Sequence, residues 1–168
     1  MSDFEKGKRT VVFSTLPQTA SELSALPQAA MQSPYDTAAL FVAALGVYNS
    51  NKDEFFAMAN VLRGPSPLTP RDNAFFTGKL TEYLARSYFD GATPQNDYIP
   101  SQPYTVILSD NPHSYAAEGH AKLFVQCGGA DSPRAITMRL AKDGKWYLTE
   151  YSSILLGIRN PESSNPWA

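Results

Sequence analysis

The stretch "RAITMRLAKDGKWYLTEYSSILLGI", residues 134–158, predicts an antiparallel hairpin close to the end of the chain. Apolar and polar residues alternate on both sides of the Lys-Asp-Gly triplet at 142–144, and Asp-Gly is a frequent hairpin turn. A two-residue turn leaves Trp146 facing water, whereas a three-residue turn with a glycine bulge pairs Leu140 with Trp146. We expect the second register, because it also pairs Met138 with Leu148 and buries Trp146 and Leu148 together, at about 25 cal/mol per Å² of apolar area.

Glu150 interrupts the apolar face of the second strand of this hairpin. In a strand every second side chain lies on the same face, so Trp146, Leu148 and Glu150 share one side of the sheet. The expected register places Glu150 opposite Ile136, on the face that helices cover. A carboxylate there needs a hydrogen bond or an ion pair, because an unpaired buried charge is strongly unfavourable.

Two interpretations of Glu150 stay open. The functional one is a pocket acid that orients a ligand or takes a proton, and the structural one is a carboxylate paired inside the protein. Arg139 is the available partner in the two-residue register, and Tyr48 or Tyr83 in the three-residue register. The candidate ligand-binding residues are therefore Glu150, Trp146, Tyr48 and Tyr83.

The first half of the chain has a helical period. Residues 33–50 begin with a serine cap, a proline and an acid, which is typical of a helix start, and are apolar on most sides. A second helix is expected over 51–63, where Gly64 ends it, and a third over 69–86. A shorter helix within 19–31 follows a possible strand at 10–14.

The second half has the period of strands. Alternating apolar residues predict four strands within 104–109, 114–127, 134–141 and 145–151, joined in order as an antiparallel meander. Residues 87–103 have no regular period and form a long connection, the kind of segment that often borders a site. We therefore expect an α+β fold in which N-terminal helices pack on a four-stranded antiparallel sheet.

Two resemblances support this fold. The Asp-Gly-Lys-Trp hairpin at 143–146, preceded by helices, resembles the nuclear transport factor 2-like, or cystatin-like, α+β cone, which implies that the sheet is curved. The tract "SPRAITMRLAKDGKWYLTEYSSILLGIRNP" at 132–161, with "SYFDGATP" at 87–94 and "PYTV" at 103–106, resembles an uncharacterised bacterial family over most of residues 30–168. That family implies no activity.

Composition bounds the kind of protein. The 168 residues predict a single domain, 1–168, with 1–18 and 160–168 as peripheral or flexible termini. The net charge is −2 and the basic residues are scattered, which argues against nucleic acid as a partner. The single cysteine, Cys127, excludes an internal disulfide, and the longest apolar run, 38–45, is too short to cross a bilayer. We expect a cytoplasmic protein that does not bind membranes.

The sequence assigns no catalytic residue, metal or cofactor. Cys127 and His120 do not form a pair of nucleophile and base. Their odd spacing on one predicted strand puts them on opposite faces, about 23 Å apart. His113 and His120 lack the spacing of metal ligands. The loop "CGGADSPR" at 127–134 suits either an anion site with Arg134 or, as we prefer, a hairpin loop whose glycines take positive φ.

Two functions remain. The first is a non-enzymatic module that binds a small molecule or a partner, with a homodimer formed through the outer sheet face by Tyr147 and Tyr151. The alternative is a small isomerase, hydratase or hydrolase of the cone type, in which Glu150 or another acid reaches a mostly apolar pocket together with a second polar group. A partly polar cavity beside Glu150 distinguishes the second from the first.

Overall fold

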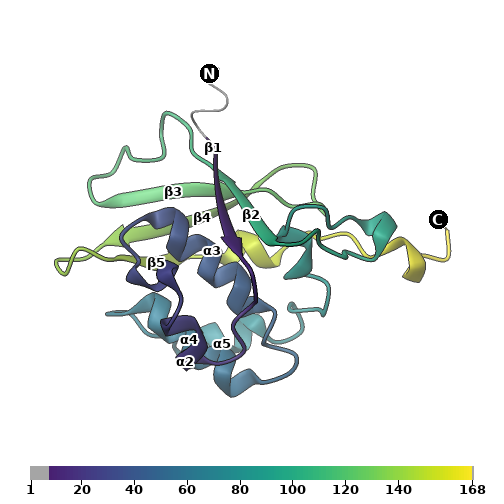
Figure 1. Ribbon diagram of the computed structural model, residues 1–168, viewed down its shortest axis with the longest axis horizontal. Coiled ribbons are helices and arrows are strands. Elements are labelled where there is room, and N and C mark those ends of the chain that lie inside the picture. Colours follow the sequence, from purple (N-terminus) through teal and green to yellow (C-terminus); the bar gives the residue numbers. More distant parts are fainter. Residues whose placement is uncertain (1–7, 168) are drawn as a thin grey trace.

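One antiparallel sheet forms the upper layer of the protein, and helices cover one of its faces (Figure 1). The computed structural model describes residues 8–167. The strands follow one another in chain order across the sheet. They are β1 (Lys8–Phe13), β2 (Tyr104–Ser109), β3 (His120–Val125), β4 (Arg134–Leu140) and β5 (Trp146–Glu150).

The α-helices of the described residues lie almost entirely in the first half of the chain. They are α2 (Ala20–Ser24), α3 (Pro34–Leu45), α4 (Lys52–Arg63) and α5 (Pro70–Phe76). Single 3₁₀ turns occur at Pro27–Ala30, Arg86–Tyr88, Pro94–Asn96, Ser152–Leu155 and Glu162–Ser164. The predicted helix starts are confirmed, with Ser33, Asn51 and Thr69 as caps. The third helix is shorter than expected, because it ends at Phe76 and not near Arg86.

Helix α3 is the centre of the core. All its residues from Thr37 to Leu45 are buried, and the helix contacts α4 as well as all five strands. This burial explains why its sequence is apolar on most sides: α3 lies between the sheet and another helix, with no face left for water.

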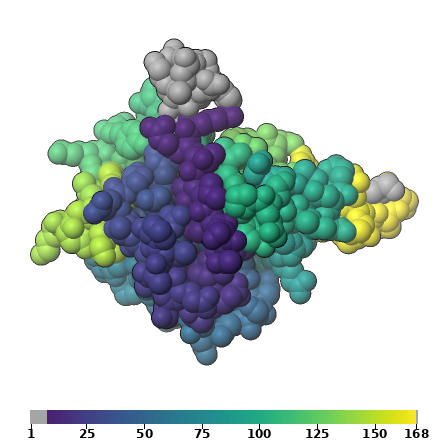
Figure 2. Space-filling model, viewed as in Figure 1, coloured from purple at the N-terminus to yellow at the C-terminus, as the bar shows by residue number. Residues whose placement is uncertain are grey.

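The sheet has five strands, not the expected four. The possible strand at 10–14 is real and pairs antiparallel with β2 from Lys8 to Phe13. Val11 and Phe13 are buried, so this part of the expected peripheral segment 1–18 belongs to the core. Figure 2 shows β1 as the purple strip down the middle of one face of the molecule. Within residues 8–167, no helix has the length and apolarity that crossing a bilayer requires.

The register of the last hairpin is confirmed. Leu140 pairs with Trp146, and Met138 pairs with Leu148, as a three-residue turn requires. The ladder then shifts, because Thr137 pairs with Glu150. One step along β4 therefore corresponds to two steps along β5, which is a β-bulge.

Candidate functional site

Glu150 lies at the surface, so the prediction that helices shield it is wrong. The bulge explains the error, because it breaks the alternation that put Glu150 on the inner face. The carboxylate is hydrogen-bonded, as expected, but locally: Oε1 accepts from the Ser152 hydroxyl at 2.7 Å and from the Ser152 N–H at 2.8 Å. These bonds, with smaller contributions from a Tyr151 backbone hydrogen bond and from the charge of Arg63, outweigh partial burial and lower the pKa of Glu150.

Tyr151 occupies the inner position that was expected for Glu150. Its ring is buried and stacks on Phe76, with centroids 5.2 Å apart and planes 5° apart. Its hydroxyl donates to Asp72 Oδ1 at 2.8 Å. Burial raises the pKa of Tyr151. Partial burial acts to raise the pKa of Asp72, but hydrogen bonds from Thr69 and Tyr151 and the charge of Arg63 outweigh it and hold that pKa below its ordinary value.

The other candidates do not gather around Glu150. Trp146 is half-buried, and its backbone joins β5 to the helical layer: its N–H donates to the Met31 carbonyl at 2.8 Å, and its carbonyl accepts from Thr37 Oγ1 at 2.7 Å. Tyr48 is buried in an aromatic cluster, where it meets Phe55 edge to face at 5.3 Å. These contacts give both residues a structural role, in joining β5 to the helices and in filling the core.

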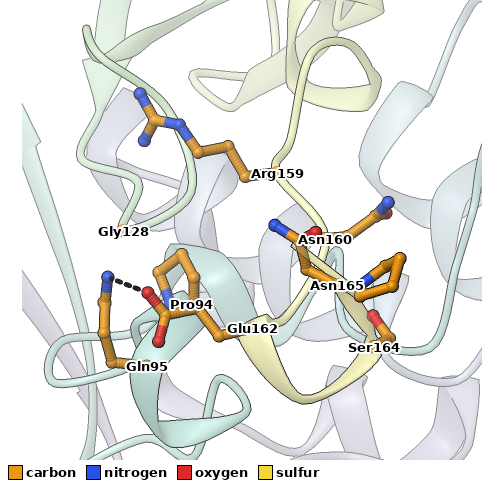
Figure 3. Close-up of a pocket in the computed structure, with 9 residues that line it drawn as sticks. Pro94, Gln95, Gly128, Arg159, Asn160, Glu162, Ser164 and Asn165 are labelled. Carbon is orange, nitrogen blue, oxygen red and sulfur yellow. Dashed lines mark hydrogen bonds between the residues drawn. The ribbon is translucent and has the colours of Figure 1, made fainter. Parts of the chain in front are cut away.

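A large surface pocket lies at the other end of the sheet, where the C-terminal segment runs beside the connection between α5 and β2 (Figure 3). We call it the tail pocket. Its volume is ≈ 670 Å³. It is lined by Pro94, Gln95, Gly128, Arg159, Asn160, Glu162, Ser164, Asn165 and Pro166.

Two stacked tyrosines hold the wall of the tail pocket. The rings of Tyr83 and Tyr98 lie 5.4 Å apart and 11° from parallel. Tyr98 donates to the carbonyl of Arg159 at 2.6 Å, and Tyr83 donates to the Asn160 side chain. Tyr83 is thus the one predicted pocket residue that supports this pocket, from behind its wall. Sequence reasoning missed the pocket itself, although it had singled out residues 87–103 as a segment that borders a site.

The floor of the tail pocket requires a glycine at 128. The Gly128 N–H donates to the Ser87 carbonyl at 2.8 Å, and a Cβ atom at Gly128 would overlap the carbonyl oxygen of Ala92. A Cβ at Gly129 would meet the Tyr98 hydroxyl. Neither glycine has a positive φ, so the expected reason for them is wrong. Close packing of this loop against the connection is the actual reason.

The charges of the tail pocket are balanced. Arg159 forms an ion pair with Asp131, and Glu162 accepts a hydrogen bond from Gln95 Nε2 at 3.1 Å, the dashed line in Figure 3. The remaining polar groups are amides and a hydroxyl, with Ser164 donating to the Pro161 carbonyl at 2.9 Å. The pocket therefore presents mainly neutral donors and acceptors. Its one cation and its one anion already have partners.

The residues with reactive side chains lie elsewhere. Cys127 is buried, with its thiol donating to Ser87 Oγ at 3.4 Å. His120 is at the opposite end of β3, where Nδ1 lies 3.0 Å from the Glu118 carbonyl. Arg134 does not serve an anion in the loop, since it donates to the Gly157 carbonyl at 3.1 Å. No cluster of histidine, cysteine or acidic residues suited to a metal ion occurs in the part of the chain that the structure describes.

A family model described as Domain of unknown function (DUF6935) matches residues 15–162. The chain belongs to this family. The match begins just after β1 and includes most of the tail pocket, and it confirms the expected membership in a family of unknown function. No curated protein and no solved structure matches the chain. The cone resemblance therefore stays a prediction, and the fold that is shown is an α+β fold with an open five-stranded sheet.

Proposed function

We propose that this DUF6935 chain is a non-enzymatic module that binds a small, uncharged polar ligand in the tail pocket. The observation that supports it is the pocket itself. Its volume, ≈ 670 Å³, is within the range of small-molecule sites, about 300–1,000 Å³. Hydrogen bonds from Tyr83 and Tyr98 hold its wall, so little ordering remains when a ligand binds.

The lining favours a polyhydroxylated ligand. Gln95, Asn160 and Asn165 each carry an amide that makes one hydrogen bond, with Glu162, Tyr83 and Trp167 respectively, and keeps further donor and acceptor capacity that matches hydroxyl groups. A charged ligand gains little here, because Arg159 and Glu162 already have partners. Trp167, which directly follows the pocket wall, is 92% exposed and presents a ring on which the apolar face of a sugar can stack.

Glu150 does not lie where the enzymatic alternative requires a pocket acid. That alternative required Glu150 or another acid to be shielded beside a cavity, and Glu150 is exposed and bonded to Ser152. The tail pocket has one acid, Glu162, and one hydroxyl, Ser164, but Glu162 is bonded to Gln95 and Ser164 to the Pro161 carbonyl, and the lining has no cysteine or histidine. We therefore do not carry the isomerase, hydratase or hydrolase alternative further.

The test is a titration of the ¹⁵N-labelled protein with neutral monosaccharides, glucose and N-acetylglucosamine, followed by amide chemical shifts. Shifts are expected at 94–95, 128–129 and 159–166. Gln95→Met keeps the size of the side chain and removes its polar groups, so it should weaken binding about fivefold. The matched control is Gln18→Met, at an exposed site outside the pocket. Shifts confined to other residues, or equal affinity of both variants, would contradict the proposal.

A homodimer through the outer sheet face stays a proposal, with different contact residues from those expected. Tyr151 is buried on the inner side, and Tyr147 is half-buried. The apolar side chains that the outer face does present are Val12, which is exposed, and the partly exposed Ile107 and Phe124. Light scattering on the purified chain decides the oligomeric state. The cytoplasm likewise stays the expected compartment.

A further inference from the structure

The β4–β5 hairpin lies on the far side of the molecule from the C-terminal tail (Figures 1 and 2). A second pocket lies beside this hairpin. We call it the hairpin pocket. Its volume is ≈ 390 Å³. It lies between the loop after α4 and the hairpin, and it is lined by Arg63, Pro65, Ser66, Arg139, Leu140, Ala141, Lys142, Tyr147 and Thr149.

The inner wall of the hairpin pocket is held in place without a ligand. Arg63 is fixed by two bonds, from Nε to the Ser66 carbonyl at 2.9 Å and from Nη1 to the Thr149 carbonyl at 3.0 Å. The Tyr147 ring lies so close to Gly64 that a Cβ there would overlap it, and its hydroxyl donates to Asp143 Oδ2 at 2.7 Å. A preformed wall reduces the entropy lost when a ligand binds.

The residues that line the hairpin pocket carry positive charge only, although the carboxylate of Asp143 lies next to the pocket and accepts a hydrogen bond from Tyr147. Three cations line it, Arg63, Arg139 and Lys142, and no acidic residue does. Arg63 shares its charge with neighbouring carboxylates, since it helps to lower the pKa of Asp72 and of Glu150. The side chains of Arg139 and Lys142 have no hydrogen-bond or ion-pair partner among residues 8–167.

The same pocket presents apolar surface. Pro65 is exposed, and the ring of Tyr147 lies on the same face of the sheet as Arg139. Leu140 borders the pocket, but its side chain lies on the opposite face, with Trp146. Pro65, Ala141 and the Tyr147 ring form the apolar wall. Exposed apolar side chains gathered beside unpaired cations are typical of a site for an amphiphilic anion.

We propose that the hairpin pocket binds a small apolar carboxylic acid, with the carboxylate between Arg139 and Lys142 and the hydrocarbon part against Pro65 and Tyr147. The planar guanidinium of Arg139 matches the two oxygens of a carboxylate. The volume is near the lower end for small-molecule sites, which suits a short chain or a single ring. The ligand class, the residues and the location differ from those of the tail pocket, so the two sites stand or fall separately.

The experiment is a titration of the ¹⁵N-labelled protein with octanoate, with 1-octanol and octyl phosphate as parallel probes. Octanoate should shift the amides of 63–66, 139–142 and 147–149 and leave the tail pocket unchanged. Octanol has the same apolar part without the charge, so it should bind about tenfold more weakly. If octanol binds as tightly as octanoate, the cations do not contribute to binding and the proposal is refuted. If octyl phosphate binds much more tightly than octanoate, the ligand is not a carboxylic acid.

Variants of the two unpaired cations complete the test. Arg139→Gln with Lys142→Gln should weaken octanoate about tenfold or more. The matched control is Arg71→Gln with Lys122→Gln, which removes the same two charges at exposed sites outside the pocket. Pro65→Ser should weaken octanoate on its own, by removing apolar contact. Unchanged affinity in the double variant and in Pro65→Ser, or no binding of octanoate at millimolar concentration, would overturn the proposal.

Discussion

Tyr151→Phe should destabilise the protein more at neutral pH than at low pH. The substitution keeps the ring that stacks on Phe76 and removes the hydroxyl that donates to Asp72 at 2.8 Å. A hydrogen bond to a charged group contributes about 1.5–3 kcal/mol, and because water reaches part of the Asp72 carboxylate we expect a loss of about 1–2 kcal/mol. Tyr151→Ala also removes the buried ring and should cost about 3–5 kcal/mol.

The pH dependence follows from the pKa of Asp72. The folded state lowers this pKa below the value of an unfolded aspartic acid, about 3.9. The stabilisation is therefore complete above the unfolded pKa and is lost as the pH falls through the folded pKa. The difference between the native chain and Tyr151→Phe should shrink in that acid window.

Urea unfolding followed by circular dichroism, at neutral pH and at several acid values, measures both effects. The control is Tyr115→Phe, since Tyr115 is exposed and its hydroxyl makes only a long contact, 3.4 Å, with Tyr35. A Tyr151→Phe protein that is as stable as the native chain at neutral pH would mean that Tyr151 does not face Asp72. The bulge in β5 would then be wrong as well.

Two further substitutions test the local structure. Glu150→Gln should lower the free energy of unfolding by no more than about 1 kcal/mol, since the carboxylate is at the surface and its bonds to Ser152 are local. A loss of several kcal/mol, measured by urea unfolding, would mean that Glu150 is buried after all. Gly128→Ala should cost about 1–3 kcal/mol, because the added methyl overlaps the Ala92 carbonyl. Gly46→Ala is the control, because there the methyl meets an ordinary contact at 3.6 Å and the backbone is helical. Its free energy of unfolding should stay equal or rise by up to about 1 kcal/mol. Equal losses in both variants would refute the packing argument.

Much of the fold follows from short-range patterns in the chain. The helix starts at Ser33 and Thr69 depend on side chains that bond to backbone only two or three residues away. The pairing of Leu140 with Trp146 depends on a three-residue turn. Such interactions involve few residues, so the sequence next to them is enough to predict them.

The two pockets could not be predicted from such short-range patterns in the sequence. The tail pocket exists because residues far apart in the chain meet, as when Tyr83 bonds to Asn160 and Gln95 bonds to Glu162. Gly128 is required by the carbonyl of Ala92, which no periodicity in the loop reveals. The hairpin pocket likewise needs the loop after α4 to lie against β5, through Arg63 and Thr149.

The sequence alone determined the α+β class, the order of the last strands and the hairpin register, because helix caps, alternation and turn residues act within a few positions. The tertiary structure decided which of two neighbouring residues faces inward. Strand alternation favours Glu150, but the stacking of Tyr151 on Phe76 and its bond to Asp72 favour the bulge that turns Glu150 outward. A tyrosine ring is stabilised in an apolar core where a carboxylate is not, and that difference in burial energy outweighs the regular pattern of one strand.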